Sequence, residues 1–207
     1  GVEEILKIGE EAESELDLFD EDYLDKINKI KLPNTKIKLL QKVLAKAIGE
    51  LRKINRIKGI DFSRRMQQLV EQYNDRSVND ILRSEVYEEM AEQLTNLIWD
   101  VHKEFTAGDV LGIDFEEKAF YDILKELCVK YDFTYPDDKM IELAKKVKEL
   151  VDSQSRYPDW NKREDIKSAL KVGLILLLDE YDYPPVERDE VYIEIFEQAE
   201  NFKKNKQ

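Results

Sequence analysis

Apolar residues recur at intervals of three and four along almost the whole chain. A clear example follows Lys36, where Ile37, Leu40 and Leu44 open an apolar stripe that continues to Ile54. An α-helix turns once every ~3.6 residues, so this spacing places the apolar side chains on one helical face. No alternation of period two extends over more than a few residues. The pattern therefore predicts an all-α fold with no significant sheet.

The same spacing predicts about seven helices, which together form an irregular multi-helix bundle. Glycine, proline or a short polar break separates each predicted helix from the next. The predicted ranges are 36–59, 61–73, 78–106, 114–127, 136–150, 161–178 and 187–202.

Residues that commonly cap helices support several of these boundaries. Asn34 or Thr35 can accept the first free backbone N–H groups of the first helix, and Gly59 is a suitable stop. Pro136 suits the first position of the fifth helix, where the N–H that proline lacks would have no partner. Two pairs have the spacing of a capping box, Asp114 with Glu117 and Asn161 with Glu164.

The C-terminal third carries the most apolar segment of the chain. Apolar residues occupy every face of the sixth helix near Val172–Leu178, which predicts a central, buried helix. This run of seven residues is too short to cross a bilayer, which needs roughly 20, so no membrane span is expected. The lysine-rich tail from Lys203 is expected to fray. Trp160 and Tyr183 are expected to be core residues rather than interface residues.

Composition fits a globular helical protein in a reducing compartment. Hydrophobic residues make up 42% of the chain and charged residues 38%, with only 7 Gly and 5 Pro. Cys128 is the only cysteine, so the chain can form no internal disulfide and no thiolate cluster for zinc. The start of the chain is acidic and does not resemble a signal peptide. We therefore expect a cytoplasmic protein.

Charge divides the chain into three segments. Residues 1–28 carry 2 basic and 11 acidic side chains, whereas residues 29–65 carry 12 basic and 2 acidic ones. The net charge of the whole chain is −13, so residues 66–207 are acidic as well. We interpret residues 1–207 as a single helical domain with an acidic N-terminal segment, a basic helical segment and an acidic helical bundle. Such asymmetry predicts a localised contact with a polyanion or an acidic surface.

The motifs of common catalytic sites are absent from the sequence. None of the seven glycines has the spacing of a phosphate-binding loop. His102 is the only histidine, and the residue three positions before it is Trp99 rather than the Glu that a metal site in a helical bundle would need. The triplet 116–118 has the Glu-x-Lys order of some nucleases but opens a predicted helix. We therefore predict no catalytic, cofactor-binding or metal-binding residue in this chain.

Nine basic residues in the segment 29–65 are candidates for contact with DNA or with a partner. Three of them are lysines spaced four residues apart on the first predicted helix, and the others lie at its end and in the next helix. They are Lys38, Lys42, Lys46, Arg52, Lys53, Arg56, Lys58, Arg64 and Arg65. Such a ridge can pair with phosphates and release counterions. The alternative is a cationic face neutralised by acidic residues of the chain itself, particularly Glu10–Asp25.

Four stretches of the sequence, in this order and spacing, resemble the C-terminal region of type I restriction enzyme R subunits, which carry motor and nuclease activities. The stretches are LFDEDYLDKINKIKLPNTKIKLLQKVLAKAI, DFSRRMQQLVEQYNDRSV, LGIDFEEKAFYDIL and DWNKREDIKSALKVGLILLLDEYDYPP. The resemblance covers nearly the whole chain. One departure is that many relatives have a more basic run after the Asp-Trp pair, where this chain has Gly173–Leu178.

This resemblance implies that the chain is one part of a larger, ATP-dependent type I site-specific deoxyribonuclease. The nuclease domain and the motor lobes, with their ATP and Mg, would lie upstream, so the chain itself would not be an enzyme. It would dock the subunit onto the methyltransferase and specificity subunits and help to hold double-stranded DNA near the motor. Two alternatives stay open from the residues alone, a stand-alone helical adaptor and a DNA-binding regulator.

Overall fold

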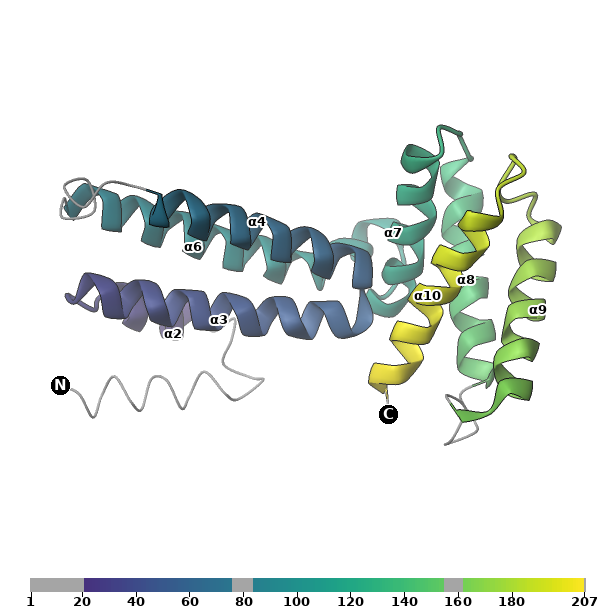
Figure 1. Ribbon diagram of the computed structural model, residues 1–207, viewed down its shortest axis with the longest axis horizontal. Helices are drawn as coiled ribbons and strands as arrows, with labels where there is room; N and C mark the ends of the chain where they lie inside the picture. Colours follow the sequence, from purple (N-terminus) through teal and green to yellow (C-terminus); the bar gives the residue numbers. More distant parts are fainter. Residues whose placement is uncertain (1–20, 76–83, 155–161, 207) are drawn as a thin grey trace. The chain divides into compact units, whose positions relative to one another are not determined.

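The computed structural model describes residues 21–75, 84–154 and 162–206. These ranges contain eight α-helices, one 3₁₀ helix and no strand, which confirms the predicted all-α fold (Figure 1). The elements are α2 (Glu21–Asn28), α3 (Pro33–Ile54), α4 (Arg56–Asn74), α6 (Ser84–Glu104), η1 (Ala107–Leu111), α7 (Phe115–Lys130), α8 (Asp137–Gln154), α9 (Glu164–Glu180) and α10 (Asp189–Lys206). The helix that the apolar spacing did not predict is α2, which lies within the acidic segment.

The described helices form two compact units. The first unit contains residues 21–50, 60–75 and 84–104, and the second contains residues 51–59, 105–154 and 162–206. The end of α3 and the beginning of α4 therefore belong to the second unit, whereas most of both helices belongs to the first.

The first unit is built around the apolar faces of α3 and α6. Leu40, Leu44, Leu94 and Ile98 are fully buried there, and Ile27 of α2 is buried as well. Contacts between side chains fix how the helices run. Residues early in α4 meet residues late in α6, because Arg65 contacts Asp100 and Tyr73 contacts Tyr87, so these two helices are antiparallel.

The second unit is a bundle of four helices. Helix α7 packs against α8 and α10, α8 packs against α9, and α10 contacts α7, α8 and α9. The core is continuous through the four helices and includes the fully buried Phe120, Leu143, Leu178 and Ile195. Tyr183 is a core residue, as predicted, and its hydroxyl donates a hydrogen bond of 2.8 Å to the backbone oxygen of Leu124. Trp160 lies outside the described residues.

Several predicted helix boundaries are wrong by a few residues. Helix α3 begins at Pro33 rather than after Asn34 or Thr35, because proline is well suited to a first helical position. The helix ends at Ile54, and Gly59, the predicted stop, lies inside α4. The capping box of Asp114 and Glu117 is confirmed by reciprocal hydrogen bonds of 2.7 and 3.0 Å.

Helix α9 begins one residue after Arg163, whose side chain makes no capping bond. Asn161, the predicted cap, lies outside the described residues. Helix α8 begins at Asp137, directly after the proline expected to open it.

Two further predictions for the C-terminal third are wrong. Helix α9 is not buried on every face, because only Ile166, Leu170, Leu174 and Leu178 point into the core. The opposite face is exposed although it is apolar. The lysine-rich tail does not fray, since α10 continues to Lys206 and the side chain of Lys203 is buried. An apolar composition, therefore, does not by itself place a residue in the core.

Candidate interaction surfaces

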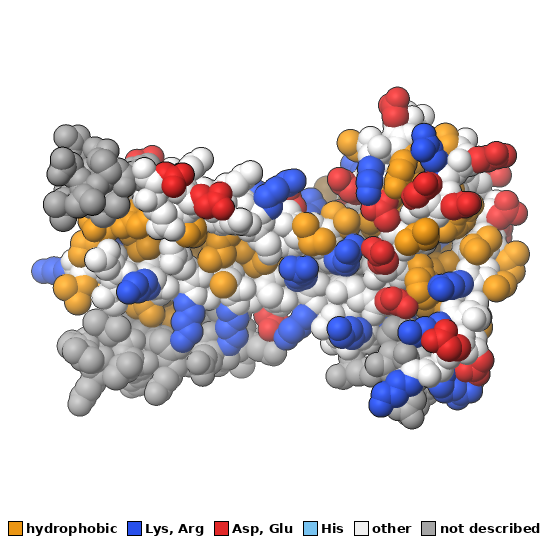
Figure 2. Space-filling model, viewed as in Figure 1, with side chains coloured by type: hydrophobic (Ala, Val, Ile, Leu, Met, Phe, Trp, Pro, Cys, Tyr) orange, Lys and Arg blue, Asp and Glu red, His pale blue; other side chains and the backbone are white. Residues whose placement is uncertain are grey.

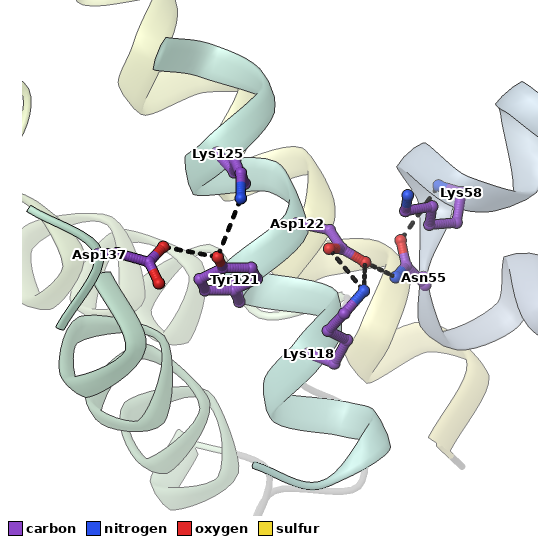
Figure 3. A network of polar contacts seen from close by, with 7 residues as sticks. All are labelled: Asn55, Lys58, Lys118, Tyr121, Asp122, Lys125 and Asp137. Atoms are coloured by element: carbon purple, nitrogen blue, oxygen red, sulfur yellow. Dashed lines mark hydrogen bonds and ion pairs between the residues drawn. The ribbon is translucent and has the colours of Figure 1, made fainter. Parts of the chain in front are cut away.

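The junction between α3 and α4, residues Leu51–Gly59, is organised by Asn55. Its side chain is 1% exposed, and its Oδ1 atom accepts a hydrogen bond of 3.1 Å from the backbone N–H of Lys58, so Asn55 caps the start of α4. Its Nδ2 atom donates a 2.8 Å bond to Asp122 of α7 (Figure 3). One amide side chain thus caps the start of α4 and attaches the junction to α7.

Asp122 also forms a buried ion pair with Lys118, one turn earlier in α7. The ammonium lies 2.7 and 2.8 Å from the two carboxylate oxygens, and both side chains are less than a tenth exposed (Figure 3). A charge removed from water needs an opposite charge and hydrogen bonds to offset its desolvation. Asp122 obtains both, from Lys118 and from Asn55. This cluster holds the junction in position. Both carboxylate oxygens of Asp122 already accept hydrogen bonds.

Helix α10 holds the same junction from a second side. The buried side chain of Gln198 accepts a hydrogen bond from the Arg56 backbone N–H at 3.1 Å and donates one to the Ile54 oxygen at 2.8 Å. Asn201 donates a 3.0 Å bond to the backbone oxygen of Arg52. These bonds satisfy carbonyl groups at the end of α3 and an N–H group at the start of α4, which would otherwise lack partners within their own helices.

A second polar cluster on α7 contains Tyr121, Lys125 and Asp137. The Tyr121 hydroxyl donates a 2.6 Å bond to Asp137 and accepts one of 3.2 Å from Lys125 (Figure 3). Burial, followed by the bond to Asp137, raises the pKa of Tyr121, and the bond to Tyr121 raises the pKa of Lys125. Both groups therefore keep their protons at neutral pH. Since a general base or nucleophile needs the opposite shift, the cluster is suited to linking α7 with α8.

The single cysteine bonds a backbone oxygen, and the single histidine packs against an aromatic ring. The Cys128 thiol donates a 3.3 Å bond to the Leu124 oxygen, and burial raises its pKa, so it is not an activated thiolate. His102 packs edge-on against Trp99 with 5.6 Å between the ring centroids. Within the part of the chain that the structure describes, no three His, Cys, Asp or Glu side chains are grouped as a metal site. No described helix has the length and hydropathy of a membrane span.

The nine candidate contact residues fall into three groups in the structure. Lys38, Lys42 and Lys46 lie one turn apart on α3 in the first unit, and the first two are exposed. Figure 2 shows Lys and Arg side chains spaced along this helix. Among the described residues, neither Lys38 nor Lys46 forms an ion pair. We name the three lysines the α3 lysine row. Lys38 and Lys46 are available to an external anion.

The other candidates are divided between the junction and α4. Arg52, Lys53, Arg56 and Lys58 belong to the junction. Arg56 pairs with Glu197 at 3.3 Å. In the first unit, Arg64 pairs with Asp61, while Arg65 contacts both Asp61 and Asp100. Acids within the described residues thus partly neutralise these arginines. Most of the acidic stretch that the sequence suggested for this role, Glu10–Asp25, lies outside the described residues.

Sequence reasoning missed two features of the surface. In the first unit a cavity of about 340 Å³ beside the α2–α3 turn is lined by Lys29, Lys31 and Lys36, and Lys36 pairs with Glu88 at 3.7 Å. In the second unit, α9 and α10 expose four large apolar side chains, which we name the α9–α10 apolar surface: Val172, Ile175, Leu176 and Ile193. Charge spacing could have revealed the first feature. The second is invisible in the sequence, because its residues continue the pattern of the core.

Comparison with known proteins shows the family to which this chain belongs. The family model for the C-terminal part of type I restriction enzyme HindI endonuclease subunit-like proteins matches residues 1–205. The chain is 24% identical over 200 residues to the type I restriction enzyme HindI endonuclease subunit of Haemophilus influenzae, a match that covers 97% of the chain. It is 27% identical over 207 residues to a Methanocaldococcus jannaschii protein named as the MjaIXP endonuclease subunit of a type I restriction enzyme, covering 96% of the chain.

Each match covers only 18% of the relative's own length. No solved structure gives a significant match. Because the family model covers almost the entire sequence, and both relatives agree with it, the chain belongs to the family of C-terminal regions of HindI-like type I restriction endonuclease subunits.

Proposed function

We propose that this chain is a docking module, which attaches a type I restriction endonuclease subunit to its methyltransferase and specificity subunits. The α9–α10 apolar surface carries the proposal. Leu176 is 64% exposed, Ile193 57% and Val172 56%, and they lie on two neighbouring helices of one unit. Adjacent large apolar side chains left in water are typical of a surface that another protein covers.

The second element of the proposal is a contact between the α3 lysine row and the DNA backbone. Lysines one helical turn apart can follow successive phosphates and displace their counterions. The acidic remainder of the chain would repel DNA, so the contact would be confined to the basic segment. Base recognition is assigned to the partner subunits, since phosphate contacts carry no sequence information.

Catalysis is assigned to other parts of the polypeptide. Both relatives are endonuclease subunits more than five times as long as the matched region. ATP and Mg would then bind outside residues 1–207, in motor and nuclease domains. Family membership over residues 1–205 favours this interpretation over a stand-alone adaptor or a DNA-binding regulator.

Deletion of residues 1–207 from the full-length subunit tests the docking proposal. The truncated subunit should still hydrolyse ATP at its basal rate but should no longer form a complex with the purified methyltransferase–specificity core. Size-exclusion chromatography with light scattering measures the complex, and ATP hydrolysis reports whether the remaining domains are folded. A truncated subunit that assembled and cleaved DNA normally would reject the docking role.

A further inference from the structure

A groove lies between α9 and α10 in the middle of the α9–α10 apolar surface. It has a volume of about 260 Å³, and its lining is almost entirely apolar: Lys171, Leu174, Ile175, Tyr192, Ile193 and Phe196. Leu174 is buried, whereas Ile175 and Ile193 are 48% and 57% exposed. Hydrophobic side chains are visible over these two helices in Figure 2. The groove is therefore a hydrophobic binding surface whose edges are also apolar.

Acidic residues predominate at one end of the groove. Helix α9 ends with Asp179 and Glu180, and α10 begins with Asp189 and Glu190, so all four carboxylates lie at the helix ends that the connection joins. All four side chains are exposed, and within the described residues none of them forms an ion pair. We name these four residues the acidic rim. Arg188, a cation of this connection, lies over the ring of Tyr131 at 5.9 Å. Lys171, the cation of the lining, lies over the ring of Phe196 with its Nζ 4.8 Å from the centroid.

Charge also discriminates between possible occupants. A second copy of this chain has a net charge of −13, and the apolar face of its basic helix α3 is already buried in its own first unit, so it offers no basic helix with a free apolar stripe. The first 20 residues of the chain carry eight acidic side chains and one lysine, so the acidic rim repels them. Like charges brought together at an interface cost binding free energy, and opposite charges select the partner. An occupant with an apolar stripe and basic residues satisfies both the groove and its rim.

We propose that the α9–α10 groove binds an amphipathic helix of a partner subunit, with lysines or arginines at the end that meets the acidic rim. The inference rests on the docking function proposed above and gives it a surface and a chemistry. Helices bind in apolar grooves through side chains at positions i, i+3 or i+4, and i+7. Ile175 and Ile193 then contact the apolar stripe from the two sides, and the acidic rim pairs with the basic end.

Substitutions in the full-length subunit test the groove. Ile175→Glu with Ile193→Glu places one charge on each side of the groove at positions that are already exposed, so the fold should survive. The matched control is Val110→Glu, because Val110 is 92% exposed in η1 and does not line the groove. We expect the double variant to bind the purified methyltransferase–specificity core at least tenfold more weakly, and the control to bind normally. Circular dichroism and the thermal midpoint verify that both variants are folded.

A second pair of measurements tests the chemistry of the occupant. Neutralising the acidic rim with Asp179→Asn, Glu180→Gln, Asp189→Asn and Glu190→Gln should weaken binding to the core and reduce its dependence on salt. A photo-crosslinking residue introduced at position 175 should attach to a peptide of the core with an apolar helical stripe and nearby lysine or arginine.

The outcomes separate the two proposals. If deletion of residues 1–207 abolishes assembly but the groove variant assembles normally, docking stands and the groove inference is overturned. If the groove variant fails but rim neutralisation changes neither affinity nor salt dependence, the basic helix is the wrong occupant. Loss of subunit self-association without loss of core binding would identify a second copy instead and would also overturn the inference.

Discussion

At the scale of single residues, the buried polar side chains of this chain join one helix to another. Asn55, Asp122 and Gln198 are each less than a tenth exposed, and each connects two elements by hydrogen bonds. Their positions could not be predicted from the sequence, because an Asn or Asp in a polar stretch is normally solvated. Asp114, by contrast, was predictable as a cap, since a capping box depends only on residues three positions apart.

Asp122→Ala should be strongly destabilising. It leaves the Lys118 ammonium and the Asn55 amide buried without their acceptor, and breaking a buried pair from one side costs about 3–5 kcal/mol. The free energy of unfolding in urea measures the loss. Glu126→Ala, an exposed acid on the same helix, is the control and should change stability by less than about 0.5 kcal/mol. Adding Lys118→Met to Asp122→Ala should restore part of the loss; no restoration would mean that the ammonium is not desolvated.

Tyr135 should make the fold sensitive to alkaline pH. Its hydroxyl donates a 2.6 Å bond to the Tyr181 oxygen, and burial, aided by Asp182, raises its pKa from 10.0 to about 12. The unfolded chain therefore loses this proton first, so the contribution to stability is complete below pH 10 and is lost as pH rises from 10 to about 12. Urea midpoints across this range should fall less steeply for Tyr135→Phe than for the unmodified chain. Equal slopes would contradict the assignment.

At the scale of elements, local signals predicted the helices, and tertiary contacts decided their ends. The apolar spacing is a property of each helix alone, so seven of the eight described α-helices could be anticipated. The break between α3 and α4 could not, because it lies at Asn55 within a continuous helical pattern and depends on Asp122 and Gln198, which are remote in sequence. The burial of α9 was also misjudged, since the number of neighbours around a helix is not encoded in its own pattern.

The two glycines Gly49 and Gly59 should respond in opposite ways to substitution by alanine. Both lie inside helices, where glycine is less stable than alanine by about 0.5–1 kcal/mol. Nothing lies within 4 Å of a Cβ added at Gly49, so Gly49→Ala should raise stability by that amount. A Cβ at Gly59 would lie 2.6 Å from the Arg52 Cα, so Gly59→Ala must move backbone and should cost about 1–3 kcal/mol. Thermal midpoints of the two variants measure the contrast, and a shift of the same sign in both would refute it.

At the scale of the whole molecule, the family could be predicted from four stretches of sequence, whereas the functional surface could not. Charge segmentation identified a basic region, yet it treated nine cations as equivalent. The structure separates Lys38 and Lys46, which form no ion pair among the described residues, from arginines that have acidic partners, such as Arg64 and Arg65. Asp61 pairs with both arginines at local helical spacings, whereas the pair of Arg65 with Asp100 depends on the approach of α4 and α6, which no local pattern specifies. A test of DNA contact must therefore compare the two groups.

The α3 lysine row should account for most of the salt-dependent DNA affinity that this chain gives to the full-length subunit. Each phosphate neutralised adds about 0.9 to the slope of log affinity against log salt, so Lys38→Gln, Lys42→Gln and Lys46→Gln together should reduce the slope by about 2 to 3. Arg64→Gln with Arg65→Gln should change it less, because Asp61 and Asp100 already compensate these charges. Fluorescence anisotropy with a duplex lacking the recognition site, titrated at several salt concentrations, measures both slopes. Arg64 and Arg65 already pair with acids, whereas Lys38 and Lys46 form no ion pair among the described residues. Equal slopes for the two variants would therefore remove DNA contact from the proposed function and leave only docking.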